Sequence, residues 1–380
     1  MSKKRLCLAI LLPLFCIAIL AVLFLGWQQQ NRQQLAATNL IDEEASAAAT
    51  PVPVDPLATF NILLLGYGGA NHDGGNLADT IILAQVAPHQ EKVSLLSLPR
   101  DLWVKLPFSA RADQETDFYS KINRTLALGN SSKEYLWRPE QFQGKDGGGN
   151  LARAVVSEII GQPVDYYLAV DFSGFEKLIN LLTNNQGLTV NVPYSFTDEY
   201  YPLTGEENNL CGYTEEDLAT MSATLKDYDL EKMFTCRYET IQFNKGKQTL
   251  DSANVLKFVR SRHSGYGGGD FGRSQRQQAV LAAVKDLIFS PKILPKLPKL
   301  IEQSLKMIKT NLSLSAITEK LFLNCDWANF DLSSQVLSNQ NYLRDSRSRD
   351  GQYILIPRLG LDNYSEIQTL VATMSAQVSP

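Results

Sequence analysis

The sequence has few of the residues on which metal sites and nucleic-acid-binding domains usually depend. Its 380 residues include only three histidines and five cysteines. No cysteine pair has C-x-x-C or His/Cys spacing, which argues against a zinc site. Acidic residues outnumber basic ones by 40 to 36, and the pI is about 5.6. Because a nucleic-acid-binding domain usually carries a basic face, this balance predicts no nucleic-acid partner.

One long stretch without charge lies near the N-terminus. Residues 6–27 follow the basic residues Lys3, Lys4 and Arg5. A bilayer core needs about 20 apolar residues, whereas a secretory signal has an apolar region of only about 7–15 residues. The stretch therefore predicts a retained transmembrane signal anchor. Cleavage after Ala45-Ser46-Ala47 is the alternative, but that sequence lies far beyond the apolar run.

The positive flank predicts that residues 1–5 form a cytoplasmic tail and that everything after Trp27 lies outside the cytoplasm. Residues 28–57 are polar, rich in alanine and interrupted by prolines, which predicts a disordered stalk. The folded part of the chain is thus expected to begin near residue 58.

Short apolar runs and amphipathic segments alternate over the rest of the chain. Strands are expected at residues 61–65, 81–86, 93–98, 166–170, 188–192 and 352–356. Helices are expected at residues 151–160, 172–182, 251–259, 315–323 and 364–374. This alternation predicts an α/β sandwich. Residues 89–91 are expected to form a hairpin turn, residues 144–150 a loop and residues 343–350 a solvated turn.

Residues 197–240 form an acidic segment that is expected to be an irregular insertion. It contains Cys211 and Cys236. Outside the membrane a disulfide between these two cysteines is expected. Two unpaired cysteines remain the alternative, because Cys325 makes the number of cysteines beyond the anchor odd.

The most concentrated charge pattern lies at residues 258–278, FVRSRHSGYGGGDFGRSQRQQ. It contains four arginines and a single acid: Arg260, Arg262, Arg273, Arg276 and Asp270. Since Arg260 and Arg262 are two residues apart, an extended segment would point them the same way. A helix is expected to begin near residues 272–274, after the glycine-rich loop.

The phase of this helix predicts where its polar residues point. Its apolar positions are Val280, Leu281, Val284, Leu287 and Ile288. The same spacing, continued backward, points Arg273, Arg276 and Gln277 toward the interior and Gln278 and Lys285 outward. Buried arginine needs an anionic partner, and a helix N-terminus favours anions. The segment therefore predicts a phosphate or pyrophosphate site; an arginine-rich surface loop with ordinary salt bridges is the alternative.

Taken together, these segments resemble the LytR–CpsA–Psr family. The matching motifs are NILLLG (61–66), ADTIIL (78–83), SLPRD (97–101), KIN (121–123), residues 167–172, VRSRH (259–263) and DFGRSQRQQ (270–278). They occur in the family's order and define a catalytic domain over residues 58–290, which residues 291–380 are expected to complete. The resemblance implies a three-layer α-β-α sandwich with a central mixed sheet and an apolar lipid tunnel.

The resemblance also implies a function. The family's members are enzymes of the bacterial cell membrane, with a single span and an extracytoplasmic C-terminal domain. They move a glycopolymer from a polyprenyl-pyrophosphate carrier onto peptidoglycan, with formation of a phosphodiester, and Mg²⁺ (or Mn²⁺) assists. Two alternatives remain: a non-catalytic protein that binds polyprenyl lipid or wall polymer, and a pyrophosphatase acting on the glycan-carrying lipid.

Several residues fall on the family's functional positions. Those implied to bind the pyrophosphate and its lipid are Arg100, Lys121, Arg260, Arg262, Arg273 and Gln277. Asp79 falls on a carboxylate near the magnesium. Asp101 is a candidate base for the acceptor hydroxyl, or else a residue that orients Arg100. Where the family often has a second carboxylate this chain has Tyr67, and Asp73 is the candidate replacement as a metal ligand.

The same residues suit this chemistry on physical grounds. Phosphoryl transfer requires charge to be neutralised over phosphate oxygens and requires the reacting oxygens to be held in line. Arginine is always charged and binds oxygens in pairs. The acceptor hydroxyl is the nucleophile, so no serine, cysteine or histidine is needed for that role.

Overall fold

A computed structural model describes residues 55, 57–69, 74–113, 115–225, 228–288, 293, 300, 303–304, 307–312 and 330–376. Within these ranges no helix is both long and apolar enough to cross a membrane. The predicted anchor at residues 6–27 and the predicted helix at residues 315–323 lie outside the described residues, as does nearly all of the predicted stalk.

The chain divides into two compact units. Unit 1 comprises residues 1–67, 77–171 and 285–380. Unit 2 comprises residues 68–76 and 172–284. The domain boundaries expected from the sequence stay predictions.

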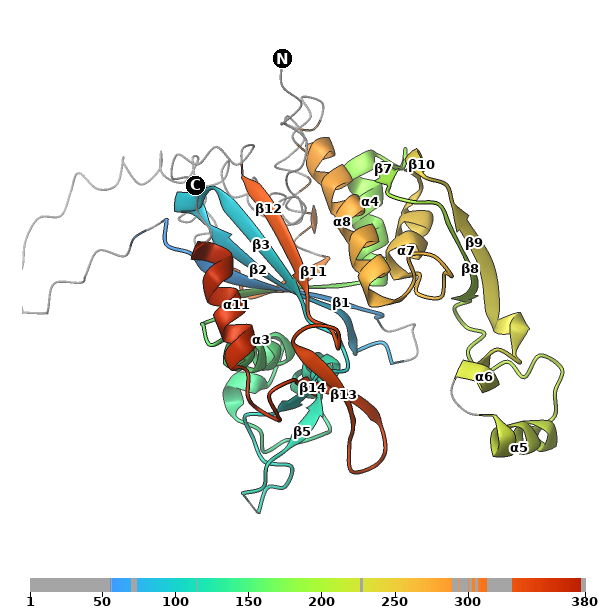
Figure 1. The fold of residues 1–380 in the computed structure, drawn as a ribbon, viewed down its shortest axis with the longest axis horizontal. Coiled ribbons are helices and arrows are strands. Elements are labelled where there is room, and N and C mark those ends of the chain that lie inside the picture. The colour runs from blue at the N-terminus through green and yellow to red at the C-terminus, as the bar shows by residue number, and fades with distance from the viewer. Residues whose placement is uncertain are drawn as a thin grey trace, which may run out of the picture. The chain divides into compact units, whose positions relative to one another are not determined.

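Unit 1 contains a mixed sheet (Figure 1). In spatial order its strands are β11 (Ile308–Thr310), β6 (Tyr166–Asp171), β1 (Phe60–Tyr67), β2 (Ala78–Ala87), β3 (Lys92–Ser97) and β12 (Asp331–Val336). β1 runs parallel to β6 and antiparallel to β2, and β3 runs parallel to β12. The predicted central mixed sheet and four of its strands are thus confirmed. β11 and β12 were not expected from the sequence.

The predicted turn between the second and third strands is confirmed. Pro88–Gln90 forms a single 3₁₀ turn (η1), and Glu91 follows in the left-handed region with φ of 47°. The Glu91 amide donates to the Pro88 carbonyl at 3.1 Å. β2 and β3 then pair as an antiparallel hairpin.

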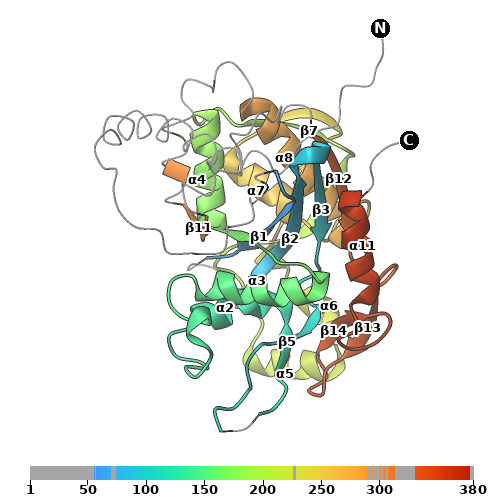
Figure 2. The same cartoon turned by 90° about the vertical axis from the view of Figure 1, so that its left-hand side faces the viewer.

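Three helices of unit 1 form a layer over this sheet: α2 (Thr125–Asn130), α3 (Gly147–Ile160) and α11 (Ser365–Ala376). α3 contacts α2, β6 and α11, and α11 also contacts β3 (Figure 2). The predicted helices at 151–160 and 364–374 are confirmed. The mixed sheet and one helical layer agree with expectation, whereas the full three-layer sandwich and the apolar tunnel stay predictions.

The predicted loop at residues 144–150 is wrong for its second half, because α3 begins at Gly147. Because glycine has no side chain, the start of α3 can pack closely against the ring of Tyr167. A Cβ on Gly149 would lie 2.2 Å from Cζ of Tyr167. The Tyr167 hydroxyl donates to Oδ1 of Asp146 at 2.7 Å, next to the start of the helix. The glycines therefore reflect packing and not a flexible connection.

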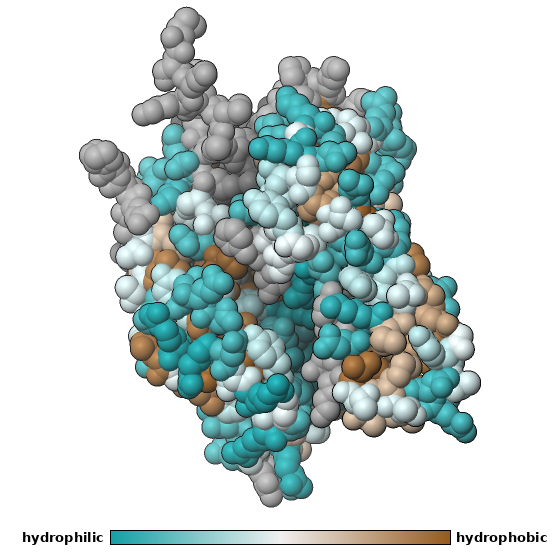
Figure 3. All heavy atoms as spheres, turned by 45° about the vertical axis from the view of Figure 1, so that its right-hand side comes forward, coloured by the Kyte–Doolittle hydropathy of each residue, from teal (hydrophilic) through white to brown (hydrophobic). Residues whose placement is uncertain are grey.

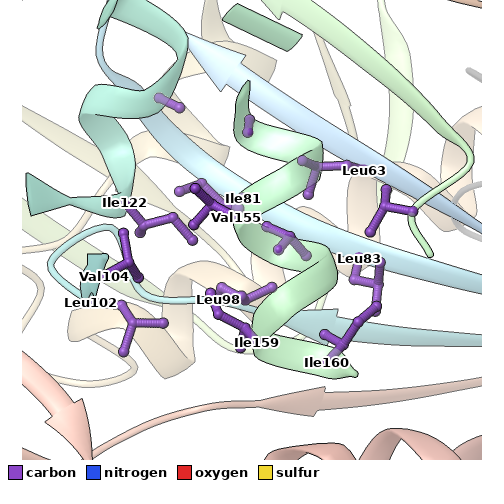
Figure 4. Close-up of a cluster of buried hydrophobic side chains, with 14 of the residues drawn as sticks. Leu63, Ile81, Leu83, Leu98, Leu102, Val104, Ile122, Val155, Ile159 and Ile160 are labelled. Carbon is purple, nitrogen blue, oxygen red and sulfur yellow. The ribbon is translucent and has the colours of Figure 1, made fainter. Parts of the chain in front are cut away.

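A continuous apolar core lies between the sheet and α3 (Figure 4). Leu63 and Leu83 contribute to it from neighbouring strands, and Val155 and Ile159 contribute from the helix. These side chains are almost completely buried. Their alternation along the strands and their spacing of four along the helix are the patterns that predicted both elements.

The predicted solvated turn at residues 343–350 is wrong for residues 343–347 but confirmed for residues 348–350, where the Gly351 amide donates to the Ser348 carbonyl at 3.0 Å. Residues Leu343–Arg347 form β13, which pairs antiparallel with β14 (Tyr353–Pro357). Leu343 is buried, while most of the charged residues after it are exposed. The exposed charged residues of β13 concealed the strand, whereas its partner β14 is mostly buried. The predicted strand at 352–356 is confirmed as β14.

The helices of unit 2 include α4 (Phe172–Thr183), α7 (Ser252–Arg260) and α8 (Gly269–Ile288). The expected helices at 172–182 and 251–259 are confirmed. Oδ1 of Asp251 accepts from the Asn254 amide at 2.7 Å and thereby caps α7. The expected strand at 188–192 is confirmed as β7 (Leu188–Val192), which pairs with β10 (Gly246–Leu250).

The segment expected to be irregular is instead an ordered hairpin with short helices at its end. β8 (Phe196–Pro202) pairs antiparallel with β9 (Tyr238–Phe243). Between them lie α5 (Glu215–Thr224) and α6 (Tyr228–Glu231). The acidic composition of the segment hid its strands because only every second residue of each faces the interior.

The expected disulfide between Cys211 and Cys236 is present, with 5.5 Å between the two Cα atoms. It closes a loop with a sequence separation of 25. Loop-closure entropy predicts that a Cys211→Ser/Cys236→Ser variant loses about 3 kcal/mol of stability in this segment. Hydrogen exchange of residues 203–237 measures the loss. A Cys325→Ser variant should exchange like the wild type, and equal protection in all three proteins would contradict the prediction.

Apolar side chains are scattered over the surface. On the face shown in Figure 3, hydrophilic and intermediate residues cover most of the described surface, and hydrophobic ones form small patches. The most exposed large apolar side chains include Leu136 and Trp137 in unit 1 and Tyr266 in unit 2. Small exposed patches of this kind do not by themselves define a binding site.

Candidate active site

In unit 1 four of the predicted site residues form one chain of alternating charges. Nη1 of Arg100 donates to Oδ1 of Asp79 at 2.8 Å, and Nε of Arg100 lies 3.6 Å from Oδ2 of Asp101. Nζ of Lys121 donates to the other oxygen of Asp101 at 2.6 Å. All four side chains are partly exposed, between 21% and 39%. The two cations are thus held in place while remaining within reach of solvent.

Short main-chain contacts fix the positions of these side chains. Asp79 is the second residue of β2, and Arg100 follows shortly after β3. Lys121 ends β5 (Tyr119–Lys121), which pairs with β4 (Trp103–Lys105). The Ile122 amide donates to the Leu102 carbonyl at 2.8 Å, and the Asn123 amide donates to the Arg100 carbonyl at 3.3 Å.

The C-terminal hairpin supports the same loop. The Leu355 amide of β14 donates to the Asp101 carbonyl at 3.0 Å. Leu102 and Leu355 also form an isolated parallel β-bridge. Asp101 is therefore fixed at its main chain by β14 and at its side chain by two cations. This arrangement suits a residue that orients Arg100 and Lys121.

Tyr67 stands where the resemblance implies a second metal-binding carboxylate, but it cannot take over that role. Its side chain is 6% exposed and belongs to the apolar core. Burial and the neighbouring Asp171 raise the pKa of Tyr67 to about 12, so its phenol stays neutral. The candidate substitute, Asp73, lies outside the described residues.

The described residues fit a magnesium ion only in part. Among them no group of three or more His, Cys, Asp or Glu side chains could hold a metal ion. Mg²⁺ nevertheless often binds through one or two carboxylates together with waters and phosphate oxygens. Asp79 fits that kind of site, in which the substrate supplies most of the ligands.

In unit 2 Arg260 is held against aromatic rings. Its guanidinium carbon lies 4.1 Å from the ring centroid of Phe172, and Nη1 donates to the Tyr201 hydroxyl at 3.1 Å. Arg260 is the last residue of α7, so Arg260 and Arg262 do not lie on one extended segment. The Ser261 amide donates to the Lys257 carbonyl at 3.0 Å, which extends the helix through Arg260.

A buried carboxylate holds the loop that carries Arg262. Oδ2 of Asp198 accepts from the Ser261 hydroxyl at 2.7 Å and from the amides of Arg262 and His263, each at 3.1 Å. Asp198 is 0% exposed. The sequence pointed to Asp270 as the acid of this region, whereas the side chain of Asp270 is outside the described set. Recognition of β8, with Phe196 and Asp198 facing inward together, would have identified Asp198.

Arg276 holds the same loop from the other side. Its Nε donates to the Phe258 carbonyl at 3.0 Å, its Nη1 donates to the Gly267 carbonyl at 2.6 Å, and its Nη2 donates to the Ser261 carbonyl. Nη1 also donates to the Tyr194 hydroxyl at 3.1 Å. The predicted inward orientation of Arg276 is confirmed by its complete burial, which lowers its pKa. Its donors are engaged with carbonyls, so Arg276 positions the loop and is not a phosphate ligand.

Three other polar residues of α8 that the sequence singled out are half-buried. Arg273 and Gln277 have this intermediate exposure, as does Gln278, which was expected to point outward. Val280 and Val284 of the predicted apolar stripe are buried. The side chains of Lys285 and Ile288 lie outside the described residues. The helix phase was therefore predicted correctly at Arg276, Val280 and Val284.

The structure thus gathers the predicted site residues into two groups, one in each unit. The first consists of Asp79, Arg100, Asp101 and Lys121. The second consists of Arg260, Arg262, Arg273 and Gln277, on the end of α7, the following loop and the start of α8. Both groups present arginine on an ordered backbone, which is a suitable arrangement for binding phosphate oxygens.

The mixed sheet and the arginine-rich motifs are consistent with the family that the sequence resembles. The profile of the LytR_cpsA_psr family matches residues 26–357, and the chain belongs to this family. The expected family membership is therefore confirmed.

Two curated relatives carry names that describe an activity, and a third is named as a regulatory protein. The chain is 27% identical over 324 residues to the polyisoprenyl-teichoic acid–peptidoglycan teichoic acid transferase TagV of Bacillus subtilis, covering 83% of this chain and 66% of TagV. It is 21% identical to the transferase TagU of Enterococcus faecalis, with 92% of each chain covered. It is 26% identical to the regulatory protein MsrR of Staphylococcus aureus, covering 70% of this chain and 60% of MsrR.

Solved structures support the fold. The crystal structure of B. subtilis TagV matches with a TM-score of 0.53 and 21% identity, covering 85% of this chain and 99% of that one. Protein gbs0355 of Streptococcus agalactiae matches with a TM-score of 0.53 and 20% identity, covering 85% and 90%. At such identities the likeness concerns the fold alone.

Proposed function

We propose that this protein is a glycopolymer phosphotransferase, which moves a polyprenyl-pyrophosphate-linked cell-wall polymer onto peptidoglycan. The observation that carries the proposal is Arg100, held between Asp79 and Asp101 beside Lys121. Two oriented cations that remain partly exposed have little structural use, but they suit a pyrophosphate. The names of TagV and TagU support the same substrate class.

The reaction conserves atoms without a further reactant. The oxygen of an acceptor sugar hydroxyl forms a bond to the phosphorus that carries the glycan. The bond between that phosphorus and the bridging oxygen breaks, and polyprenyl phosphate leaves with the electron pair. The hydroxyl proton passes to solvent or to the leaving phosphate. The products are a glycan–peptidoglycan phosphodiester and polyprenyl phosphate.

In this proposal the arginines stabilise the transition state. In unit 1, Arg100 and Lys121 neutralise negative charge on the phosphate oxygens. In unit 2, Arg260, Arg262, Arg273 and Gln277 keep their predicted role as pyrophosphate-binding residues. Asp101 orients Arg100 and Lys121, since each of its oxygens contacts one of these cations. The oriented side chains replace water around the phosphates and require no reorganisation during the reaction.

The chain would hold Mg²⁺ (or Mn²⁺) through Asp79. The ion would supply charge neutralisation on the pyrophosphate. Asp79 holds Arg100 at the same time, so it links the metal position to the phosphate-binding guanidinium. The proposed location is the outer face of a bacterial membrane, which the disulfide between Cys211 and Cys236 supports because such bonds persist in oxidising compartments.

Two other functions use the same residues. A non-catalytic protein that binds the lipid or the wall polymer is favoured by the neutral, buried Tyr67 in place of a carboxylate. A pyrophosphatase would transfer the same phosphorus to water. The three functions differ in their products and in their dependence on an acceptor.

The test follows release of polyprenyl phosphate by the full chain purified in detergent. The substrate is a short polyprenyl pyrophosphate that carries a disaccharide, and the reaction is run with and without a peptidoglycan oligosaccharide. Release that depends on the acceptor supports the transferase. Release independent of the acceptor indicates hydrolysis, and tight binding without release indicates a binding protein.

Magnesium is expected to bind only together with the pyrophosphate. We expect Asp79→Asn to raise the Mg²⁺ concentration for half-maximal activity about 10-fold, because a neutral amide is a poorer ligand than a carboxylate. Calorimetry with Mg²⁺ alone should detect little binding to the wild type, and added prenyl pyrophosphate should increase it. Asp113→Asn, at an exposed acid, is the control. Tight Mg²⁺ binding without lipid would contradict the expectation.

A further inference from the structure

The β4–β5 hairpin has two unlike faces. Trp103 is paired with Lys121 and Lys105 with Tyr119, so these four side chains project from the same face. All four are of intermediate exposure. On the other face Val104 is buried in the apolar core of unit 1. One face therefore supports the fold, and the other is available to a ligand.

The outward face carries an ordered pair of aromatic rings. The ring planes of Trp103 and Tyr119 are 9° from parallel, and their centroids are 6.5 Å apart. This separation means that the rings are displaced sideways and do not cover each other completely. The Tyr119 hydroxyl donates to Oδ2 of Asp362, which fixes the ring and raises the pKa of Tyr119 to about 12. The phenol therefore remains a protonated donor.

Charged groups border the two rings. Nζ of Lys105 contacts Asp117 at 2.6 Å, and Nζ of Lys121 contacts Asp101 at 2.6 Å. Asp362 lies at the Tyr119 hydroxyl. A prenyl chain would remove water from these charges without replacing it, which is unfavourable. A pyranose ring has an apolar C–H face for the aromatic rings and hydroxyl groups for the charged border.

The position of this face relates it to the proposed chemistry. Trp103 lies two residues after Asp101 and directly opposite Lys121. Directly paired residues on one face of an antiparallel ladder have Cβ atoms only about 4.5–5.5 Å apart. A phosphate bound by Arg100 and Lys121 would therefore leave the group attached to it next to Trp103.

We propose that Trp103 and Tyr119 form a subsite for a sugar ring of the glycan substrate. The inference rests on the proposed function, because it assigns the phosphate to Arg100 and Lys121. The sugar belongs either to the donor, next to its pyrophosphate, or to the peptidoglycan acceptor. Both present the same pyranose chemistry, and binding measurements separate them.

The test uses calorimetry on the full chain with three probes. The first is a short prenyl pyrophosphate that carries a disaccharide, the second is the same lipid without sugar, and the third is a soluble peptidoglycan oligosaccharide. We expect Trp103→Ala to weaken binding of the first or the third probe about 10-fold and to leave the second unchanged. Weakening of the first assigns the donor sugar, and weakening of the third assigns the acceptor sugar.

Controls separate the subsite from a general loss of structure. Trp103→Phe keeps an aromatic face and should retain most of the affinity. Trp137→Ala removes another exposed tryptophan of unit 1 and should bind like the wild type. Binding of all three probes within twofold of the wild type by Trp103→Ala would overturn the inference, and so would an equal loss for all three.

A second measurement does not depend on the stability of the alanine variant. Indole N–H resonances of ¹⁵N-tryptophan-labelled wild type are recorded during titration, with Trp103 assigned from Trp103→Phe. Sugar-bearing probes should shift the Trp103 resonance and leave that of Trp137 unchanged; no shift at saturation would overturn the inference. If Trp103 binds sugar but no polyprenyl phosphate is released, the subsite stands and the proposed transferase fails.

Discussion

Replacing Arg262 by alanine is expected to lower the rate of glycopolymer transfer about 10²–10³-fold, the usual loss when one oriented donor to a transition state is removed. The loop should keep its conformation, because Arg262 is held to Asp198 through its main-chain amide, which alanine retains. The guanidinium is thus removed while its support remains. The acceptor-dependent release of polyprenyl phosphate measures the effect.

Arg262→Lys distinguishes charge from geometry at this position. Lysine keeps the positive charge but cannot bind two oxygens in parallel, so its rate should lie between those of the wild type and the alanine variant. Lys247→Ala, at an exposed residue of β10, is the matched control and should transfer like the wild type. A rate within threefold of the wild type for Arg262→Ala would remove Arg262 from the proposed site.

The largest expected effect on stability is at Arg276. Arg276→Met should lower the free energy of unfolding of unit 2 by about 3–5 kcal/mol, because buried carbonyls lose their charged donor. These carbonyls belong to Phe258, Ser261 and Gly267. Denaturant unfolding measures the change. Lys247→Met introduces the same side chain at an exposed site and should stay within about 0.5 kcal/mol of the wild type.

The contributions of Arg276 and Asp198 to stability are expected to depend on one another. Both hold the loop after α7, Asp198 through its N–H and hydroxyl groups and Arg276 through its carbonyls. In a double-mutant cycle, Asp198→Asn should therefore cost less in the Arg276→Met background than alone. A loss below about 1 kcal/mol for Arg276→Met would show that these hydrogen bonds are not what holds the loop.

Much of the framework could be predicted from the sequence because its elements are strongly patterned. β1, β2 and β3 are buried runs of Val, Ile and Leu, and α4 and α7 have helical apolar spacing. The inward direction of Arg276 followed from the phase of α8. In these cases the local pattern and the tertiary packing favour the same structure.

The elements that were missed have weak local patterns. β4 and β5 are three residues each, too short for an alternation to be recognised, although they place Lys121 beside Asp101. β12 contains three polar residues in its interior and is held mainly by its parallel pairing with β3. Such strands depend on pairing with strands that are distant in sequence, and local sequence patterns do not identify those partners.

The roles of Arg276 and Asp198 could not be predicted either, because their hydrogen-bond partners are distant in sequence. Arg276 and Arg273 belong to one motif and cannot be distinguished by type, yet Arg276 binds carbonyls from three different positions along the chain. Asp198 lies about 60 residues before the loop that it holds. The sequence singled out the arginine-rich region, but it could not show that Arg276 holds the loop.

The most direct test of the proposed function is the mass of the product formed in ¹⁸O-labelled water. The full chain is incubated with the disaccharide-bearing prenyl pyrophosphate, Mg²⁺ and a peptidoglycan oligosaccharide, beside Arg262→Ala. The proposal predicts an acceptor product joined to the disaccharide by a phosphodiester that contains no ¹⁸O, formed by the wild type and strongly reduced in the variant. Disaccharide phosphate that contains ¹⁸O, without the phosphodiester, would contradict the proposal and identify a pyrophosphatase.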